Sequence, residues 1–172
     1  MTQLIAYFDH FNSTLAASVR WLALAMVAAT LAIVVLRYVF NMGAIPLQES
    51  VMYMHGFLFL LGIPYGIRQN THVRVDILYA NKLKPWQRHI DLGGHILFLL
   101  PVSIFIVYTS MPYALASWRV LERSPEVGGL PAIFILKSLI PLTGSLMTLQ
   151  ALTEVARTLL NWSAPKPSAE KL

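Results

Sequence analysis

Long apolar stretches alternate with short polar ones along this chain. No aspartate, glutamate, lysine or arginine occurs in residues 21–36, 50–67, 92–118, 127–136 and 138–153. A helix needs about 20 mostly apolar residues to cross the roughly 30 Å hydrocarbon core of a membrane. The third stretch is long enough with residues to spare, and the second is nearly so. The pattern therefore predicts membrane-spanning helices.

The first stretch becomes a full span only with the residues that flank it. It has 16 residues, so as a helix it measures about 24 Å. Arg20 and Arg37 complete the span if their long side chains reach outward to the two membrane surfaces. Trp21 and Tyr38 then lie at the interfaces, where aromatic side chains are common. We therefore predict a first helix over about residues 18–38.

Lys137 alone separates the last two stretches. We therefore predict one helix over about residues 130–153, with a lysine inside it. The two middle stretches predict helices over about residues 50–68 and 92–118. The expected number of membrane-spanning helices is four.

The predicted helices belong to one all-α integral membrane domain over residues 1–162, and no repeat or second domain is visible. Residues 163–172 include two prolines and are predicted to be a disordered tail. Hydrophobic residues make up 56% of the chain and charged residues 12%, about half the usual charged share. This is too little charge to cover a soluble domain. The absence of cysteine excludes a disulfide framework, a haem attached through CxxCH and a thiolate metal site.

The 13 lysines and arginines predict the orientation of the helices. With four spans, both ends of the chain and the loop between the second and third helices share one side. Nine basic residues fall on that side: Arg20, Arg68, Arg74, Lys82, Lys84, Arg88, Arg157, Lys166 and Lys171. The opposite side has three, namely Arg37, Arg119 and Arg123. Because cytoplasmic loops carry the excess of lysine and arginine, both termini are predicted to be cytoplasmic.

Residues 72–88, between the second and third predicted helices, mix apolar and basic side chains. Residues 72–76 alternate polar and β-branched side chains, and apolar residues 77–80 lead into Lys82, Lys84, Trp86 and Arg88. This pattern favours an amphipathic segment in the cytoplasmic interface, where basic side chains meet anionic headgroups of the membrane lipids. The alternative is a tightly folded polar loop.

The histidines are the first candidates for chemistry, because paired histidines between membrane helices can hold haem. His55 and His95 fall at opposite depths and cannot share one iron. His72 or His89 can pair with His95 near the cytoplasmic face, so a haem-binding subunit of a redox enzyme is the alternative function. The sequence has no HExxH, GxSxG or glycine-rich phosphate loop. We therefore expect no enzyme activity, no cofactor, no metal site and no nucleic-acid partner.

Three motifs follow one another around the second predicted helix. They are Arg37-Tyr38-Val39-Phe40-Asn41, Gln48-Glu49 and His72-Val73-Arg74-Val75-Asp76. Later stretches extend the set: residues 122–126 and 128–131, Lys137, Ile140-Pro141 and Leu149-Gln150. Together these motifs resemble the small permease subunit of TRAP transporters, the tripartite ATP-independent periplasmic systems of the DctQ-like family. The resemblance covers about residues 37–152.

This resemblance implies a function in solute import. It implies a four-helix subunit that binds a large permease subunit of about a dozen spans, in the bacterial inner membrane. The family also uses a periplasmic substrate-binding protein. The small subunit is expected to scaffold the large one and to help dock the binding protein, for ion-coupled uptake of an organic acid or a related solute.

Candidate structural or subunit-contact residues follow from the motifs and the helix ends. They are Arg37, Tyr38, Asn41, Glu49, Gly62, Gly66, His72, Arg74, Asp76, Lys137 and Pro141. Arg37 and Glu49 either form a salt bridge at the end of the first hairpin or are separate interfacial anchors. Gly62 and Gly66 form a GxxxG motif, which packs closely either within the bundle or against the large subunit.

Lys137 carries a charge inside the fourth predicted helix. A lysine at the centre of a spanning helix costs about 2.5–3.5 kcal/mol on insertion scales. Pro141 stands four residues later and removes the helical hydrogen bond to the carbonyl of Lys137. We expect Lys137 to point at the partner subunit or at a carboxylate such as Glu126. The alternative is a lysine that reaches the membrane surface without a partner.

Overall fold

The structure is a computed structural model that describes residues 2–69 and 84–160. Its helices are α1 (Thr2–Val19), α2 (Trp21–Tyr38), α3 (Ile45–Arg68), α5 (Lys84–Gly94), α6 (Leu100–Arg119) and α7 (Ile133–Leu160), with a π-helical turn, η1 (His95–Leu99), between α5 and α6. The described residues contain no strand. The predicted all-α fold is confirmed.

Within residues 2–69 and 84–160, four helical segments are long and apolar enough to cross a membrane, which confirms the predicted number. They are Ile5–Tyr38, Ile45–Arg68, His89–Arg119 and Ile133–Leu160. The first segment is longer than the predicted helix because α1 precedes α2 with Arg20 alone between them, and Arg20 keeps a helical backbone. Asp9 lies within α1, so the long stretches free of charged residues do not include this helix.

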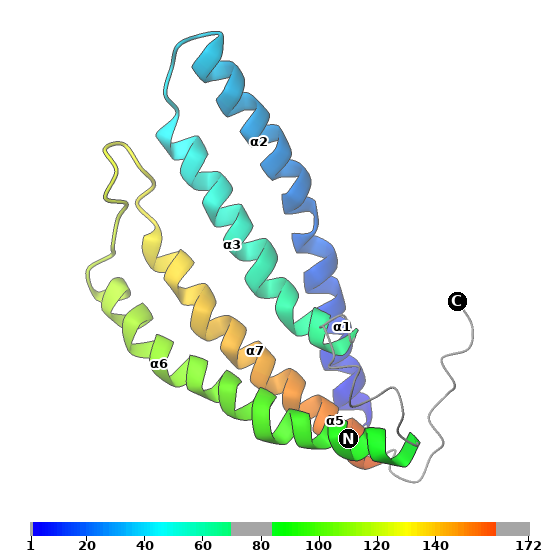
Figure 1. Cartoon of the computed structure of the whole chain (residues 1–172). Coiled ribbons are helices and arrows are strands. Elements are labelled where there is room, and N and C mark those ends of the chain that lie inside the picture. The colour runs from blue at the N-terminus through cyan, green and yellow to red at the C-terminus, as the bar shows by residue number, and fades with distance from the viewer. Residues whose placement is uncertain (1, 70–83, 161–172) are drawn as a thin grey trace.

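The spanning helices lie in an open row in the order α2, α3, α7, α6 (Figure 1). α3 packs against α1, α2 and α7, and α7 packs against α3 and α6. The hairpin loops of residues 39–44 and 120–132 lie at one end of the row, here called the loop end. The first turns of α1 and the last turns of α3 and α7 lie at the opposite end (Figure 1). No residue of α2 is buried, so this edge of the row presents a broad apolar face.

The apolar core lies where α3 and α7 meet α1. Leu61, Leu139 and Leu146 are buried there, with Phe8, Leu15, Val19, Phe57, Leu60 and Leu136 packed around them. In a membrane, close packing rather than transfer from water favours contacts between helices. α1 is therefore part of the bundle through its own core side chains.

α6 and α7 approach each other closely at Gly144. A Cβ atom at Gly144 would lie 2.9 Å from Cγ2 of Val107 and 3.2 Å from the Val107 backbone nitrogen. α6 buries small side chains, Ser103, Ser110, Ala114 and Ser117, and small residues allow such an approach. By contrast, a Cβ atom at Gly62 would meet nothing within 4 Å. Among the described residues nothing therefore packs closely on Gly62, and its contact with a large subunit stays a prediction.

Much of the predicted interfacial segment lies outside the described residues, which exclude residues 70–83. His72, Arg74 and Asp76 belong to this stretch, so their predicted roles stay predictions. The predicted tail of residues 163–172 also lies outside the described residues. α5 begins at Lys84 and continues through η1 into α6 (Figure 1).

Candidate functional site

Polar side chains gather at two places in the row of helices. The loop cluster, at the loop end, consists of Glu49, Tyr113, Glu122, Ser124, Leu130 and Lys137. The α1 network, at the opposite end, consists of Asp9, Asn12, Arg68, Gln150, Glu154 and Arg157. These two groups connect elements that lie far apart in the sequence.

Glu49 fastens α3 to the loop of residues 120–132. Its carboxylate accepts a hydrogen bond from the Ser124 hydroxyl and another, at 2.5 Å, from the backbone N–H of Leu130. A Cβ atom at Gly129 would lie 2.7 Å from Oε1 of Glu49, so only glycine leaves room for the carboxylate here. The backbone N–H of Ser124 also donates to the Leu130 carbonyl at 3.2 Å. Glu49 thereby holds the two hairpins together at the loop end.

Arg37 and Glu49 do not form a salt bridge, because the carboxylate of Glu49 is bound by the other loop. Arg37 lies exposed in the last turn of α2, and Tyr38 is 81% exposed. Asn41 adopts a left-handed backbone with φ of 56°, a conformation that asparagine tolerates better than most residues. The backbone N–H of Met42 then donates to the Leu36 carbonyl at 2.9 Å, which terminates the helix. The structure thus assigns Asn41 a local backbone role.

Lys137 pairs with a carboxylate of its own chain. Its Nζ donates to Oε2 and Oε1 of Glu122 at 2.6 and 2.8 Å, and it lies 4.2 Å from the centre of the Tyr113 ring. The carboxylate is therefore that of Glu122 and not that of Glu126, which is exposed. The backbone N–H of Glu122 donates to the Ser117 carbonyl at 3.1 Å, and this turn brings Glu122 back over α6. The side chain of Lys137 is 18% exposed, so the pair is shielded on the lysine side.

The Lys137–Glu122 pair also affects the protonation of the loop. Hydrogen bonds from Lys137 lower the pKa of Glu122 from its ordinary value of 4.5. Glu122 lies in the loop of residues 120–132, outside the spanning helices. The carboxylate is therefore ionised, and able to bind Lys137, throughout the neutral range.

Pro141 and Trp118 complete the junction of α6 and α7. Pro141 is buried within α7, and its missing N–H leaves the Lys137 carbonyl without a helical donor. Trp118 donates from Nε1 to the Ser138 hydroxyl at 2.6 Å and lies edge-on to Phe134 at 4.5 Å between ring centres. These contacts join α6 to α7 next to Lys137, which binds Glu122.

The α1 network joins three helices through ion pairs and amide hydrogen bonds. Asp9 of α1 lies 3.3 Å from Nε of Arg68 in α3 and 2.6 Å from Nη2 of Arg157 in α7. The Arg68 guanidinium also donates to the Asp9 backbone carbonyl at 3.0 Å. Arg157 contacts Glu154 on its own helix at 3.1 Å. One carboxylate on α1 thus binds the last turns of both α3 and α7.

Two amide side chains extend the network into the bundle. Nδ2 of Asn12 donates to Oε1 of Gln150 at 2.7 Å, and Nε2 of Gln150 donates to Glu154 at 2.9 Å. Gln150 is fully buried and Asn12 is 1% exposed. A buried amide without a partner costs about 1–3 kcal/mol. A shift of α1 along α7 would separate Asn12 from Gln150, so the pairing favours the observed alignment of the two helices.

Sequence reasoning did not find the α1 network as a site. In the sequence, Gln150 belongs only to a motif that resembles the family, and Asp9 and Asn12 precede the first apolar stretch. One signal was available: an aspartate and an asparagine three residues apart fall on one face of a helix. That face needs polar partners wherever the helix is buried.

The arrangement of the helices defines the class of protein to which this chain belongs. In the described part of the chain, four apolar spanning helices form an open row and are joined by polar contacts at both ends, which is the architecture of a helical integral membrane protein. This chain belongs to the family described as "Tripartite ATP-independent periplasmic transporters, DctQ component", whose profile matches residues 26–161. The resemblance identified from the motifs is therefore confirmed. A comparison with curated proteins and one with solved structures each gave no match.

The family is a transporter component and not an enzyme family. The alternative, a haem-binding redox subunit, is not what the matched family describes. His55, one of the histidines considered for haem, stacks on Phe59 with 4.3 Å between ring centres. Among the described residues, no group of three or more histidine, aspartate and glutamate side chains is placed to hold a metal ion.

Proposed function

We propose that this chain is the small membrane subunit of a TRAP solute-import system. In this role it scaffolds the large permease subunit and helps dock a periplasmic substrate-binding protein, for ion-coupled uptake of an organic acid or a related solute. The observation that carries the proposal is the family match over residues 26–161, which includes most of α2 and all of α3, α6 and α7.

The open row of helices supports a scaffolding role. A closed four-helix bundle would cover the inner face of each helix, whereas here the two edge helices, α2 and α6, have neighbours on one side (Figure 1). Their apolar side chains, such as Leu24, Val27 and Leu31 of α2, are exposed. Such faces suit contact with lipids and with the helices of a larger membrane partner.

We place the loop end in the periplasm and both termini in the cytoplasm of a bacterial inner-membrane protein, following the distribution of basic residues. The loop cluster then fixes the backbone of residues 120–132 on the side where a binding protein arrives. Val127, at 91% exposed, and the exposed Arg123 and Glu126 project from that loop. A loop that is held in place and exposes its side chains suits docking, because it loses little conformational entropy when a partner binds.

Co-purification tests the proposal. The tagged chain, extracted from membranes of cells that also make the permease, should recover a much larger multi-span protein, and disruption of the loop cluster by Glu49→Ala should weaken recovery of the binding protein. Met52→Ala, at an exposed methionine on the same helix as Glu49, lies outside the loop proposed for docking and is the matched control. Recovery of this chain alone, or of a haem with a Soret band, would contradict the proposed function.

A further inference from the structure

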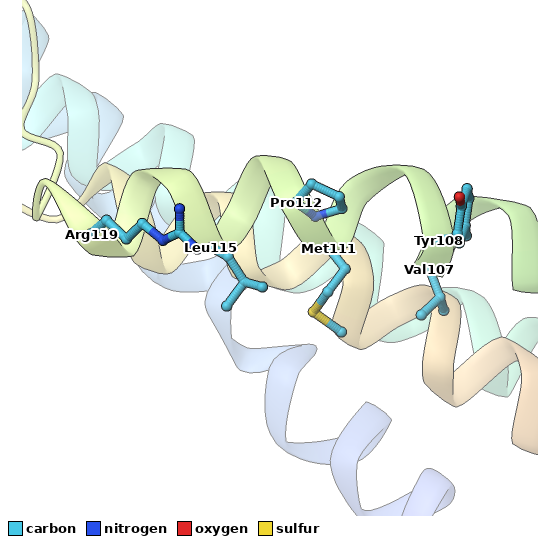
Figure 2. A pocket seen from close by; sticks show the side chains of 6 residues that line it. All are labelled: Val107, Tyr108, Met111, Pro112, Leu115 and Arg119. Atoms are coloured by element: carbon cyan, nitrogen blue, oxygen red, sulfur yellow. The ribbon is translucent and has the colours of Figure 1, made fainter.

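A groove runs along one side of α6. Its lining residues are Val107, Tyr108, Met111, Pro112, Leu115 and Arg119, and its cavity volume is about 510 Å³. Figure 2 shows these side chains along the helix, with Val107, Met111 and Leu115 directed to the same side and Arg119 at the loop end. All six belong to α6. Val107, at the inner end, also borders α7 near Gly144, and the rest of the groove is open beside α6.

The groove has the length of one membrane leaflet. Val107 and Arg119 are separated by 12 helical steps, or about 18 Å. The hydrocarbon core is roughly 30 Å thick, so one leaflet is about half of that. With Arg119 at the membrane surface, the apolar lining therefore reaches the middle of the bilayer.

Arg119 is free to bind an anion. It is exposed in the last turn of α6, and the nearest carboxylate in sequence, that of Glu122, is already bound by Lys137. Within the described part of the chain Arg119 has no ion pair. A guanidinium presents a fork of donors that matches the oxygens of a phosphate.

Pro112 lies in the middle of the groove. A proline inside a helix removes the hydrogen bond to the carbonyl four residues earlier, here that of Tyr108, and bends the helix. Tyr108 itself is 79% exposed. Tyr108 and Met111 thus lie uncovered on this side of α6, while the small residues of the same helix pack against α7.

We propose that this groove binds one phospholipid, with its phosphate on Arg119 and an acyl chain along Val107, Met111 and Leu115. A cation at the membrane surface above a leaflet-long apolar channel matches the chemistry of a phospholipid from headgroup to chain end. A protein helix would instead need a carboxylate opposite Arg119 and a broader apolar surface than one helix supplies. The inference does not depend on the proposed function, because phosphates line both surfaces of a bilayer.

Native mass spectrometry of the purified full chain tests the headgroup contact. The probes are phosphatidylglycerol and a diacylglycerol with the same acyl chains but no phosphate. The chain should retain one phosphatidylglycerol in preference to diacylglycerol. Arg119→Gln should weaken phosphatidylglycerol binding about fivefold, the effect expected for one arginine near a charged lipid surface, and should abolish the preference. Arg37→Gln, the matched control at the same end of α2, should change neither.

A second pair of variants tests the acyl-chain contact. Met111→Trp fills the groove and should reduce binding of both lipids, whereas Met52→Trp, at an exposed methionine of α3, should not. Equal retention of the two lipids by the unaltered chain, or equal effects of the arginine variants, would overturn the proposal.

Photo-crosslinking identifies the occupant in native membranes. A photoreactive residue in place of Leu115 should yield a lipid adduct, and the same residue in place of Leu31 on α2 provides the comparison. A crosslink from position 115 to another protein would show that the groove is a subunit interface and would overturn the lipid assignment. Because this readout concerns α6 alone, it is separate from the success or failure of the co-purification above.

Discussion

Lys137 shows how a charged side chain is accommodated near the start of a spanning helix. It lies four residues after Ile133, the first residue of α7, or about one turn into the helix. From there its ammonium group reaches Glu122 in the preceding loop, beside the ring of Tyr113. The pairing removes most of the cost of an isolated charge in hydrocarbon. Lys137 therefore holds the loop to α7 and does not expose an unpaired charge to lipid.

We expect the Lys137–Glu122 pair to stabilise the protein at neutral pH and to lose this effect at acidic pH. Lys137→Leu and Glu122→Gln should each lower Tm at neutral pH without preventing membrane insertion, and the double variant should lose less than the sum of the two. The pKa of Glu122 is lowered, so the stability it contributes is complete above its ordinary pKa of 4.5 and is lost as the pH falls through the lowered value. Thermal unfolding in detergent, followed from neutral to acidic pH, measures this. Additive losses, or losses that persist unchanged at acidic pH, would contradict the pairing.

At the scale of elements, α1 is the helix that connects the others. Its apolar side chains enter the core and its Asp9 binds both α3 and α7. The pairing of Asp9 with Arg157 joins residues 148 positions apart. Such a contact makes the register of three helices interdependent, which is a role attested for buried polar groups in some helical assemblies.

Removal of the Asp9 charge should loosen the bundle. Asp9→Leu leaves Arg68 and Arg157 without their shared carboxylate, and should lower the free energy of unfolding by about 1–3 kcal/mol. This is less than for a fully buried pair, because the two arginines are about a third exposed. Denaturant titration in mixed micelles measures the change, with Glu126→Leu as the control that removes an exposed carboxylate. If both variants unfold alike, the α1 network does not hold the helices together.

The contact of α6 with α7 supplies a second test at this scale. Gly144→Leu would drive its side chain into Val107 and Ile106 and should destabilise the protein by about 1–3 kcal/mol, as overpacking does. Gly62→Leu is the matched control, because a Cβ atom there meets no described residue within 4 Å. Thermal unfolding of the isolated chain should separate the two variants. A larger loss from the leucine at Gly62 would contradict the helix packing described here.

At the scale of the whole molecule, the hydropathy pattern predicts some features of the structure and not others. Four spanning helices, and the placement of Glu49 and Lys137 toward one end, follow from apolar length and helical rise. The faces along which the helices meet do not follow, because a hydropathy pattern contains no information on pairing; the contacts of Asp9 were missed for this reason. The choice of Glu122 over Glu126 depends on the turn after α6, where Leu121 has a φ of 43°. No motif in the sequence marked that turn.

The orientation of the whole molecule is open to direct test. Reporter fusions after Asn41 and after Glu122 should report the periplasm, because both positions lie in the loops at the loop end. Fusions after Lys84 and at the C-terminus should report the cytoplasm, as the distribution of basic residues predicts. A periplasmic signal after Lys84 would reverse the assignment, and with it the surface proposed for docking.

The central claim is that this chain serves a larger transporter and moves no solute itself. The most direct measurement is uptake into proteoliposomes that contain this chain alone, the large permease subunit alone, or both, with the cognate binding protein and an ion gradient supplied in each case. Only the vesicles with both membrane subunits should take up solute. Robust uptake by this chain alone would contradict the account, as would full uptake by the large subunit without it.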